Sequence, residues 1–132
     1  MGVSAVIAEV IDFPSSFNQK QLDYIAESVI ETAQQVCGKT LRDVILYGSY
    51  ARGDYQEWSD VDIMILADAD DTECKLFDKL ISERLYDLAY HMNLLLSVIV
   101  TPFGRFERMM PDYQFYLNVS KEGKRLCSTR IG

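Results

Sequence analysis

The chain has 132 residues, of which 48% are hydrophobic and 25% are charged, and this composition is typical of one ordinary folded domain spanning residues 1–132. Its formal net charge of -7 argues against an extensive nucleic-acid surface, because binding to phosphate backbones requires clustered lysine and arginine side chains. No apolar run is long enough to span a membrane, and the N-terminus lacks the basic region of a secretory signal, so we expect a cytoplasmic protein without membrane contact.

Helical periodicity predicts a first long helix from about residue 17 to residue 36. Ser16 and Gln19 have the spacing of a capping box, and Gly38 is placed to end the helix. Residues 3–11 are ambiguous between helix and strand. The apolar residues of the helix form one stripe that should pack on a sheet, and they are Leu22, Ile25, Ala26, Val29, Ile30, Ala33 and Val36.

A β-prone apolar run at residues 44–47 ends in a Gly-Ser pair, and residues 50–52 can open a short helix whose first amides are free. Free amides at the start of a helix suit phosphate oxygens. Gly48 lets the backbone approach a ligand closely without a Cβ in the way. Ser49 can cap the helix and still offer its hydroxyl to a phosphate. This segment therefore predicts a binding site for a nucleotide triphosphate.

A second strand is predicted at residues 61–66. Ser59 is a candidate nucleotide-binding residue and is expected to cap the turn before this strand and to position Asp60. Because side chains alternate along a strand, Asp60 and Asp62 should point to the same side. Two carboxylates held that close repel one another, and one pKa rises unless a cation lies between them. We therefore expect Mg²⁺ at Asp60 and Asp62, which are the candidate metal ligands and catalytic residues.

The rest of the chain continues the alternation of helices and strands. An acidic loop is expected to precede a long helix at residues 72–92, and a buried strand is expected at residues 94–100 because six of these seven residues are apolar. Pro102 should stop this strand. The remaining expectations are short helices at residues 103–109 and 113–119 and an edge strand at 124–127, while the acidic loop holds Asp68, Asp70, Asp71 and Glu73.

Gly48-Ser49, Arg52-Gly53 and Ser59-Asp60-x-Asp62 together resemble the signature of the nucleotidyltransferase superfamily that includes DNA polymerase beta. The compact chain is similar to the minimal nucleotidyltransferases of prokaryotes. This resemblance implies an α/β fold in which helices pack on a mixed β-sheet within a single small domain. It also implies that a nucleoside monophosphate, AMP, passes from magnesium-bound ATP to a hydroxyl acceptor.

In the family's mechanism, Asp60 and Asp62 would hold magnesium on the triphosphate, and the amides of Gly48 and Ser49 would grip the outer phosphates. Arg52 could neutralise developing phosphate charge, because a guanidinium matches phosphate oxygens. A salt bridge from Arg52 to Asp54 or Glu57 is equally compatible with its position. Trp58 suits core packing and base stacking equally well.

Members that transfer nucleotides usually carry a third acidic residue on the strand after the long helix, and this chain has Ser97 there. Asp87 and Glu107 are the nearest acids in sequence, but one belongs to a helix and the other lies beyond Pro102. A partner or the substrate would then supply the missing group. The alternative is a catalytically degenerate domain that binds a nucleotide or a partner and lacks the third carboxylate.

Resemblance to minimal nucleotidyltransferases also implies a partner, since this domain would be the antitoxin half of a toxin-antitoxin pair with a helical HEPN-type ribonuclease. A third interpretation is a transferase that modifies small hydroxylated antibiotics, which at this length requires a dimer cleft. Residues 3–8 and the phenylalanine-rich stretch after Pro102 could supply such an interface, or each could cover its own core. The sequence is therefore compatible with a homodimer and with a monomer.

Overall fold

The structure is a computed structural model that describes residues 19–56 and 58–128, so the predictions for Ser16 and residues 3–11 lie outside the described residues. Along the chain the elements are α2 (Gln19–Cys37), the 3-10 helix η1 (Gly38–Thr40), β1 (Leu41–Tyr47), α3 (Ser49–Arg52), β2 (Val61–Ala67), α4 (Asp71–His91), β3 (Leu96–Pro102), α5 (Phe103–Met109), α6 (Gln114–Glu122) and β4 (Lys124–Ser128). The predicted α/β class is confirmed.

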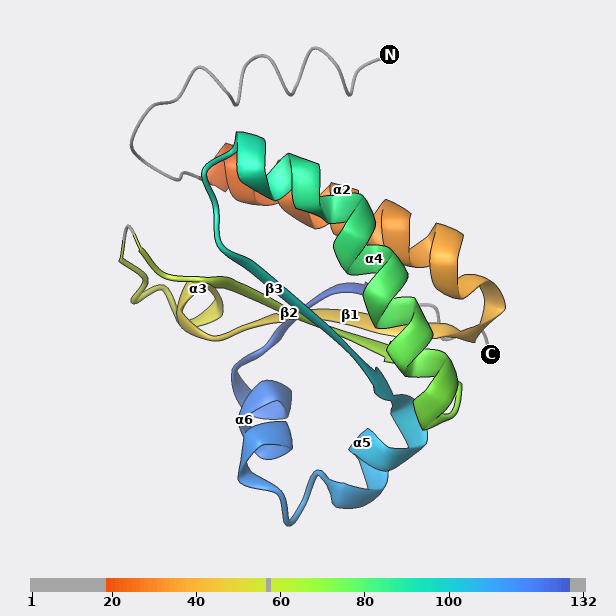
Figure 1. The fold of residues 1–132 in the computed structure, drawn as a ribbon. Coiled ribbons are helices and arrows are strands. Elements are labelled where there is room, and N and C mark those ends of the chain that lie inside the picture. Colours follow the sequence, from red (N-terminus) through yellow and green to blue (C-terminus); the bar gives the residue numbers. More distant parts are fainter. Residues whose placement is uncertain (1–18, 57, 129–132) are drawn as a thin grey trace.

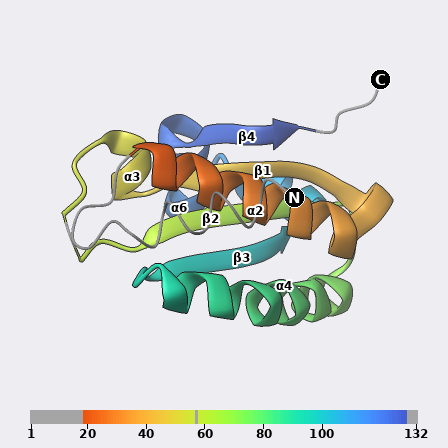
Figure 2. The same ribbon diagram turned by 90° about the horizontal axis from the view of Figure 1, so that it is seen from above.

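The four strands form one mixed sheet in the order β3-β2-β1-β4, as Figure 2 shows from above. Strand β1 is antiparallel to both β2 and β4, whereas β2 and β3 are parallel. Helix α4 makes the long connection that a parallel pair requires. The C-terminal strand lies at one edge of the sheet, as expected, and β3 lies at the other edge.

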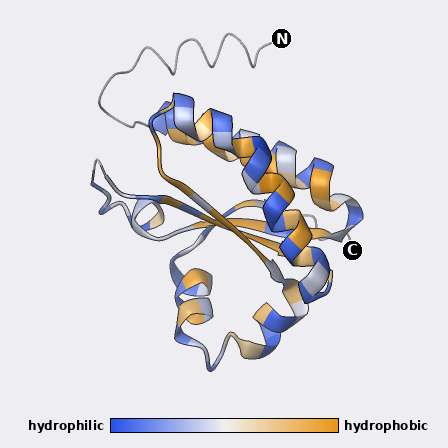
Figure 3. Ribbon diagram, viewed as in Figure 1, coloured by the Kyte–Doolittle hydropathy of each residue, from blue (hydrophilic) through white to orange (hydrophobic). Residues whose placement is uncertain are grey.

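Helices cover both faces of the sheet, with α2 and α4 on one face and α5 and α6 on the other (Figure 1). Side chains of β2 alternate between these layers, because Ile63 and Ile65 belong to the core under α2 and α4, and Met64 and Leu66 belong to the core over α5 and α6. Figure 3 shows the apolar strands between amphipathic helices. By the same alternation, Asp62 lies on the face that carries α5 and α6.

Helix α2 confirms the predicted first helix within the described residues. It ends at Cys37, and Gly38 follows with a φ of +57°, a conformation that favours glycine. Ile25, Val29 and Ala33 of the predicted stripe are buried against the sheet. No helix in the described part of the chain is long and apolar enough to cross a membrane.

The predicted acidic loop is wrong, because three of its four residues begin helix α4. Asp70 is the N-cap: its Oδ1 accepts from the Glu73 amide at 2.8 Å, and Glu73 Oε1 accepts from the Asp70 amide at 3.4 Å. Asp71 forms ion pairs with Lys75 and with Arg105 of α5. Carboxylates in a first helical turn also complement the helix dipole, so these charges support the helix rather than a loop.

The third strand differs from its prediction in both position and burial. It spans Leu96–Pro102 rather than residues 94–100, its first four residues are only half-buried, and Leu95 is 61% exposed. An edge strand has a neighbour on one side only, so an apolar run does not guarantee burial. Asp78 of α4 protects part of this edge, because its Oδ2 accepts a hydrogen bond from the Val100 amide at 3.2 Å. Pro102 ends the strand as predicted.

Candidate functional site

Gly48 connects β1 to α3 in a backbone conformation that other residues rarely adopt. Its φ of 74° and ψ of -158° lie in a region that is almost restricted to glycine. A Cβ on Gly48 would also collide with Oδ2 of Asp62. The glycine therefore admits the carboxylate of Asp62 at the strand end, a reason for glycine that differs from the expected close approach of a ligand.

The expectation that Ser49 caps the short helix is wrong. Gly48 occupies the N-cap position without a side-chain bond, and Ser49 is the first helical residue. The carbonyl of Gly48 accepts from the amides of Ala51 and Arg52 at 3.0 and 3.1 Å. Ser49 therefore takes no part in capping. Its contact with phosphate does not depend on capping and stays a prediction.

Asp60 precedes β2 and Asp62 is the second residue of this strand, where the carboxylate of Asp62 lies beside the Gly48 turn. The pKa of Asp62 is raised, first by burial and then by the charge of Asp60, while Arg52 lowers it. The predicted rise of one carboxyl pKa is confirmed, although burial contributes more than repulsion. The arrangement favours a bound cation, which would relieve both effects.

Three side chains form a row across the sheet at this end. Asp62 pairs with Tyr47 on the antiparallel side and with Ser97 on the parallel side. The ring of Phe115 from α6 packs edge-on against Tyr47, with 5.6 Å between the ring centroids. Burial and the nearby charge of Asp62 raise the pKa of Tyr47 to about 12, so this phenol stays protonated at neutral pH. Sequence reasoning missed Tyr47, because only the strand register brings it to Asp62.

The register places Ser97 directly beside Asp62, on the strand where the resemblance leads us to expect a third carboxylate. Within residues 19–56 and 58–128, no three His, Cys, Asp or Glu side chains gather closely enough to hold a metal ion. Asp87 lies on the exposed side of α4, and Glu107 lies on α5, which begins at the opposite end of β3. Neither acid joins Asp60 and Asp62.

A site with two carboxylates fits magnesium that arrives with a nucleotide. Mg²⁺ usually keeps several waters and is bound by one or two carboxylates together with substrate phosphates. Asp60 and Asp62 supply two such oxygen donors, and the burial of Asp62 adds a reason to hold positive charge nearby. The donor set therefore fits magnesium, and Asp60 and Asp62 are the residues that would hold it.

Arg52 is bound on two sides. Its Nε donates to Asp54 Oδ2 at 3.2 Å, which confirms one of the two salt bridges considered, and its Nη1 donates to Glu122 Oε1 at 3.2 Å. Glu57, the other residue considered, lies outside the described residues. The contact with Glu122 at the end of α6 was not foreseen, because no local pattern marks a pair so distant in the sequence.

The segment before β2 is shaped by Ser59, whose Oγ accepts from the Gln56 amide at 2.8 Å and whose own amide donates to the Gln56 carbonyl at 3.0 Å. Ser59 thus closes the turn before Asp60, as expected. The neighbouring Trp58 is 72% exposed, which excludes core packing and leaves its ring open to a ligand or a partner.

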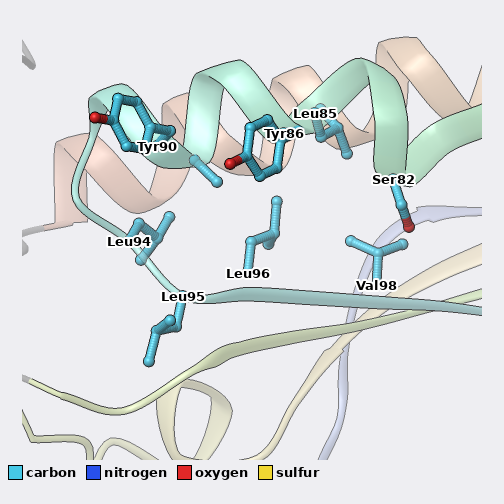
Figure 4. A pocket seen from close by; sticks show the side chains of 9 residues that line it. Ser82, Leu85, Tyr86, Tyr90, Leu94, Leu95, Leu96 and Val98 are labelled. Atoms are coloured by element: carbon cyan, nitrogen blue, oxygen red, sulfur yellow. The ribbon is translucent and has the colours of Figure 1, made fainter.

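An apolar groove lies one strand away from the carboxylates. The groove has a volume of about 360 Å³ and runs between α4 and β3. Figure 4 shows the side chains of Leu96 and Val98 pointing toward α4 and into the groove. Tyr86 and Tyr90 line the helical side. Because Ser97 alternates with Leu96 and Val98, the groove lies on the opposite face of β3 from Asp62. It is therefore not the phosphate site.

Known proteins are similar to this chain in sequence. The family model for the nucleotidyltransferase domain matches residues 29–122, a range that includes β1, β2 and the whole motif. A Methanocaldococcus jannaschii protein named "putative protein adenylyltransferase" is 36% identical over 89 residues, which are 65% of this chain and 78% of that protein. Another protein of that name and organism is 41% identical over 59 residues, 45% of this chain and 54% of its own length.

Solved structures are also similar to this chain, at lower sequence identity. A crystal structure of a toxin-antitoxin with AMP-PNP has a TM-score of 0.49 and 20% identity, and covers 80% of this chain and 74% of that one. A "putative nucleotidyltransferase" from Sulfolobus solfataricus has a TM-score of 0.47 and 19% identity, and covers 100% of this chain and 92% of that one. The family model matches well over half of the chain, and the chain therefore belongs to the nucleotidyltransferase domain family.

Proposed function

We propose that this nucleotidyltransferase transfers AMP from magnesium-bound ATP to a hydroxyl group of a protein. The observation that carries the proposal is the placement of Asp60 and Asp62 beside the Gly48 turn, within the part of the chain that the family model matches. The name of the Methanocaldococcus relatives supports the choice of AMP and of a protein acceptor.

In the proposed reaction, the backbone at Gly48 and Ser49 binds the outer phosphates, and Asp60 and Asp62 hold the metal. Arg52 lies at the end of α3, where a guanidinium can meet phosphate oxygens. Magnesium, when bound, neutralises triphosphate charge and favours attack at the α-phosphorus. The acceptor hydroxyl attacks that phosphorus, a new P–O bond forms, and the bond to pyrophosphate breaks.

The proton of the attacking hydroxyl needs an acceptor, and Ser97 occupies the place where a third carboxylate would take it. Tyr47 is also unsuited to this task, because its raised pKa of about 12 keeps it protonated. We therefore propose that the acceptor protein supplies the group that receives the proton. This requirement would make transfer depend on the correct protein acceptor.

The decisive experiment is calorimetric titration of ATP with magnesium into the wild type and into the Asp60→Asn, Asp62→Asn double variant. We expect magnesium-dependent binding in the wild type and its loss in the variant, because the two amides carry no charge to hold the cation. Equal binding in both proteins, or none in the wild type, would contradict the proposed site. A Glu83→Gln variant is the matched control, since Glu83 is an exposed carboxylate on α4.

The alternative is a catalytically degenerate domain, and it is favoured because a serine, Ser97, and not a carboxylate lies beside Asp62. This alternative predicts that ATP binds without transfer. Incubation with ATP labelled at the α-phosphate separates the two functions. Label on a protein acceptor supports transfer, whereas binding without label on any acceptor supports the degenerate domain.

A helical HEPN-type toxin, a homodimer and a cytoplasmic location stay predictions of the sequence. Co-expression with the protein of the adjacent reading frame tests the toxin. We expect the neighbouring protein to be toxic when it is expressed alone. In the presence of this chain it should be harmless and should carry covalently attached AMP. A neighbour that is harmless alone and carries no AMP would contradict the prediction.

A further inference from the structure

Arg52 is held by two carboxylates from separate parts of the chain. Asp54 lies two residues further on, whereas Glu122 is 70 positions away at the end of α6. Both contacts raise the pKa of Arg52 above its already high value, so its charge is constant at any physiological pH. A guanidinium has five N–H donors, and these contacts use two of them. As far as the described residues go, donors therefore remain for a further oxygen ligand.

The backbone next to Glu122 is tightly fitted to the sheet. Tyr116 and Val119 of α6 are buried in the core beneath β1. At Gly123, the next residue, a Cβ would collide with the side chain of Ile45 and with the carbonyl of Val119. The amide of Gly123 also donates to that carbonyl at 2.9 Å. The backbone from which the Glu122 side chain reaches Arg52 is thus held in place.

Arg52 is also within electrostatic reach of the candidate metal ligands, because its charge lowers the pKa of Asp62. An arginine side chain without other partners at this place would be drawn to the acidic pair of Asp60 and Asp62 and would compete with a cation there. The observed contacts instead direct it toward Asp54 and Glu122, whose side chains are 62% and 37% exposed.

We propose that Glu122 is a positioning residue of the nucleotide site and acts through Arg52. It holds the guanidinium at the rim of the site, where unused N–H groups meet the triphosphate while Asp60 and Asp62 remain available to the cation. This inference rests on the proposed function, because the triphosphate is the ligand for which Arg52 is held. Exposed ion pairs contribute little to folding stability, so the contact should affect ligand binding rather than unfolding.

The test is a double-mutant cycle measured by calorimetric titration of ATP with magnesium. We expect Glu122→Gln to weaken binding by about threefold to fivefold, the upper part of the range of one exposed ion pair. Glu122→Asp should recover part of the affinity, and the control Glu83→Gln should bind as the wild type does. In an Arg52→Ala background, Glu122→Gln should cause no further loss. Thermal unfolding of every variant should remain at the temperature of the wild type.

Four results would overturn the positioning role. They are normal binding by Glu122→Gln, tighter binding by that variant, a loss that adds to that of Arg52→Ala, and a fall in unfolding temperature that accounts for the lost affinity. Tighter binding would mean that Glu122 withholds Arg52 from phosphate. If the wild type itself does not bind ATP with magnesium, the proposed function fails and the role of Glu122 falls with it. Normal binding by the wild type and by Glu122→Gln removes the positioning role alone.

Discussion

The carboxylate of Asp62 lies against the Cα of Gly48, so that any side chain on Gly48 would take the place of Asp62 Oδ2. The same glycine has a φ of 74°, so two constraints exclude other residues at position 48: the backbone conformation and the Asp62 side chain on the neighbouring strand. The Gly-Ser turn and the carboxylate pair thus form one structural unit, in which the absence of a side chain on Gly48 leaves room for the carboxylate of Asp62.

This relationship predicts that Gly48→Ala displaces Asp62 and weakens binding of ATP with magnesium by at least about tenfold, the equivalent of roughly 1.4 kcal/mol. The strained backbone alone should cost about 1–3 kcal/mol of folding free energy. Calorimetric titration and urea unfolding measure the two effects.

Gly38→Ala is the matched control for that prediction, because Gly38 has a φ of +57° and nothing within 4 Å of a Cβ. It should lower the free energy of unfolding by about 1 kcal/mol and leave nucleotide binding unchanged. If Gly48→Ala resembles this control in both measurements, the position of Asp62 does not depend on the glycine.

Asp62→Asn should stabilise the protein in the absence of metal at neutral pH. The folded-state pKa of Asp62 is raised, so the folded protein disfavours the carboxylate that the unfolded chain readily forms. The resulting penalty is present above the raised pKa and disappears below the unfolded value of about 4. Unfolding temperatures of both proteins, measured from pH 3 to pH 8 with a chelator, should separate as the pH rises. A constant difference would contradict the assigned cause.

Ser97→Asp places a carboxylate beside Asp62 in the strand register. Without metal, repulsion from Asp60 and Asp62 should lower the unfolding temperature, and magnesium should restore it. If proton removal limits transfer, the rate should rise on the order of a hundredfold. Labelled AMP transfer and thermal unfolding with and without magnesium measure these effects. Ser97→Asn is the control, and an equal response of both variants would show that charge is not the cause.

Asp78→Ala should weaken the protected edge of the sheet. It removes the acceptor of the Val100 amide, and a hydrogen bond to a charged group contributes about 1.5–3 kcal/mol, with the lower end expected at this half-buried position. The exposed strand edge should also favour association between chains. Urea unfolding and light scattering test both effects. Ser82→Ala, which removes only the 3.4 Å contact between Ser82 and Asp78, should leave both unchanged.

Much of the fold could be predicted because helix and strand periodicities are local properties. The stripe of α2, the two central strands, and the short helices after Pro102 all follow from spacing within a few residues. The failures have specific causes. The acidic segment before α4 was mistaken for a loop because its capping contacts resemble solvated charge, and β3 was mistaken for a buried strand because an apolar run does not reveal a sheet edge.

The candidate site divides in the same way. Asp60 and Asp62 were predicted from their spacing, and so was the rise of one carboxyl pKa, but only from repulsion; burial, its larger cause, depends on the fold. The capping role of Ser49 was wrong because Gly48 already occupies the N-cap. The pairing of Tyr47 with Asp62 and the contact of Glu122 with Arg52 carried no local signal, so neither could be predicted before the strands and α6 were placed.

The sequence by itself determined the family, the turn at Gly48 and the carboxylate pair, because these depend on residues close together in the chain. Only the tertiary structure decided that Ser97 stands beside Asp62 and that Glu122 holds Arg52. Those contacts join segments far apart in sequence, and they exist because burial of the strands between two helical layers imposes one register and one sheet order.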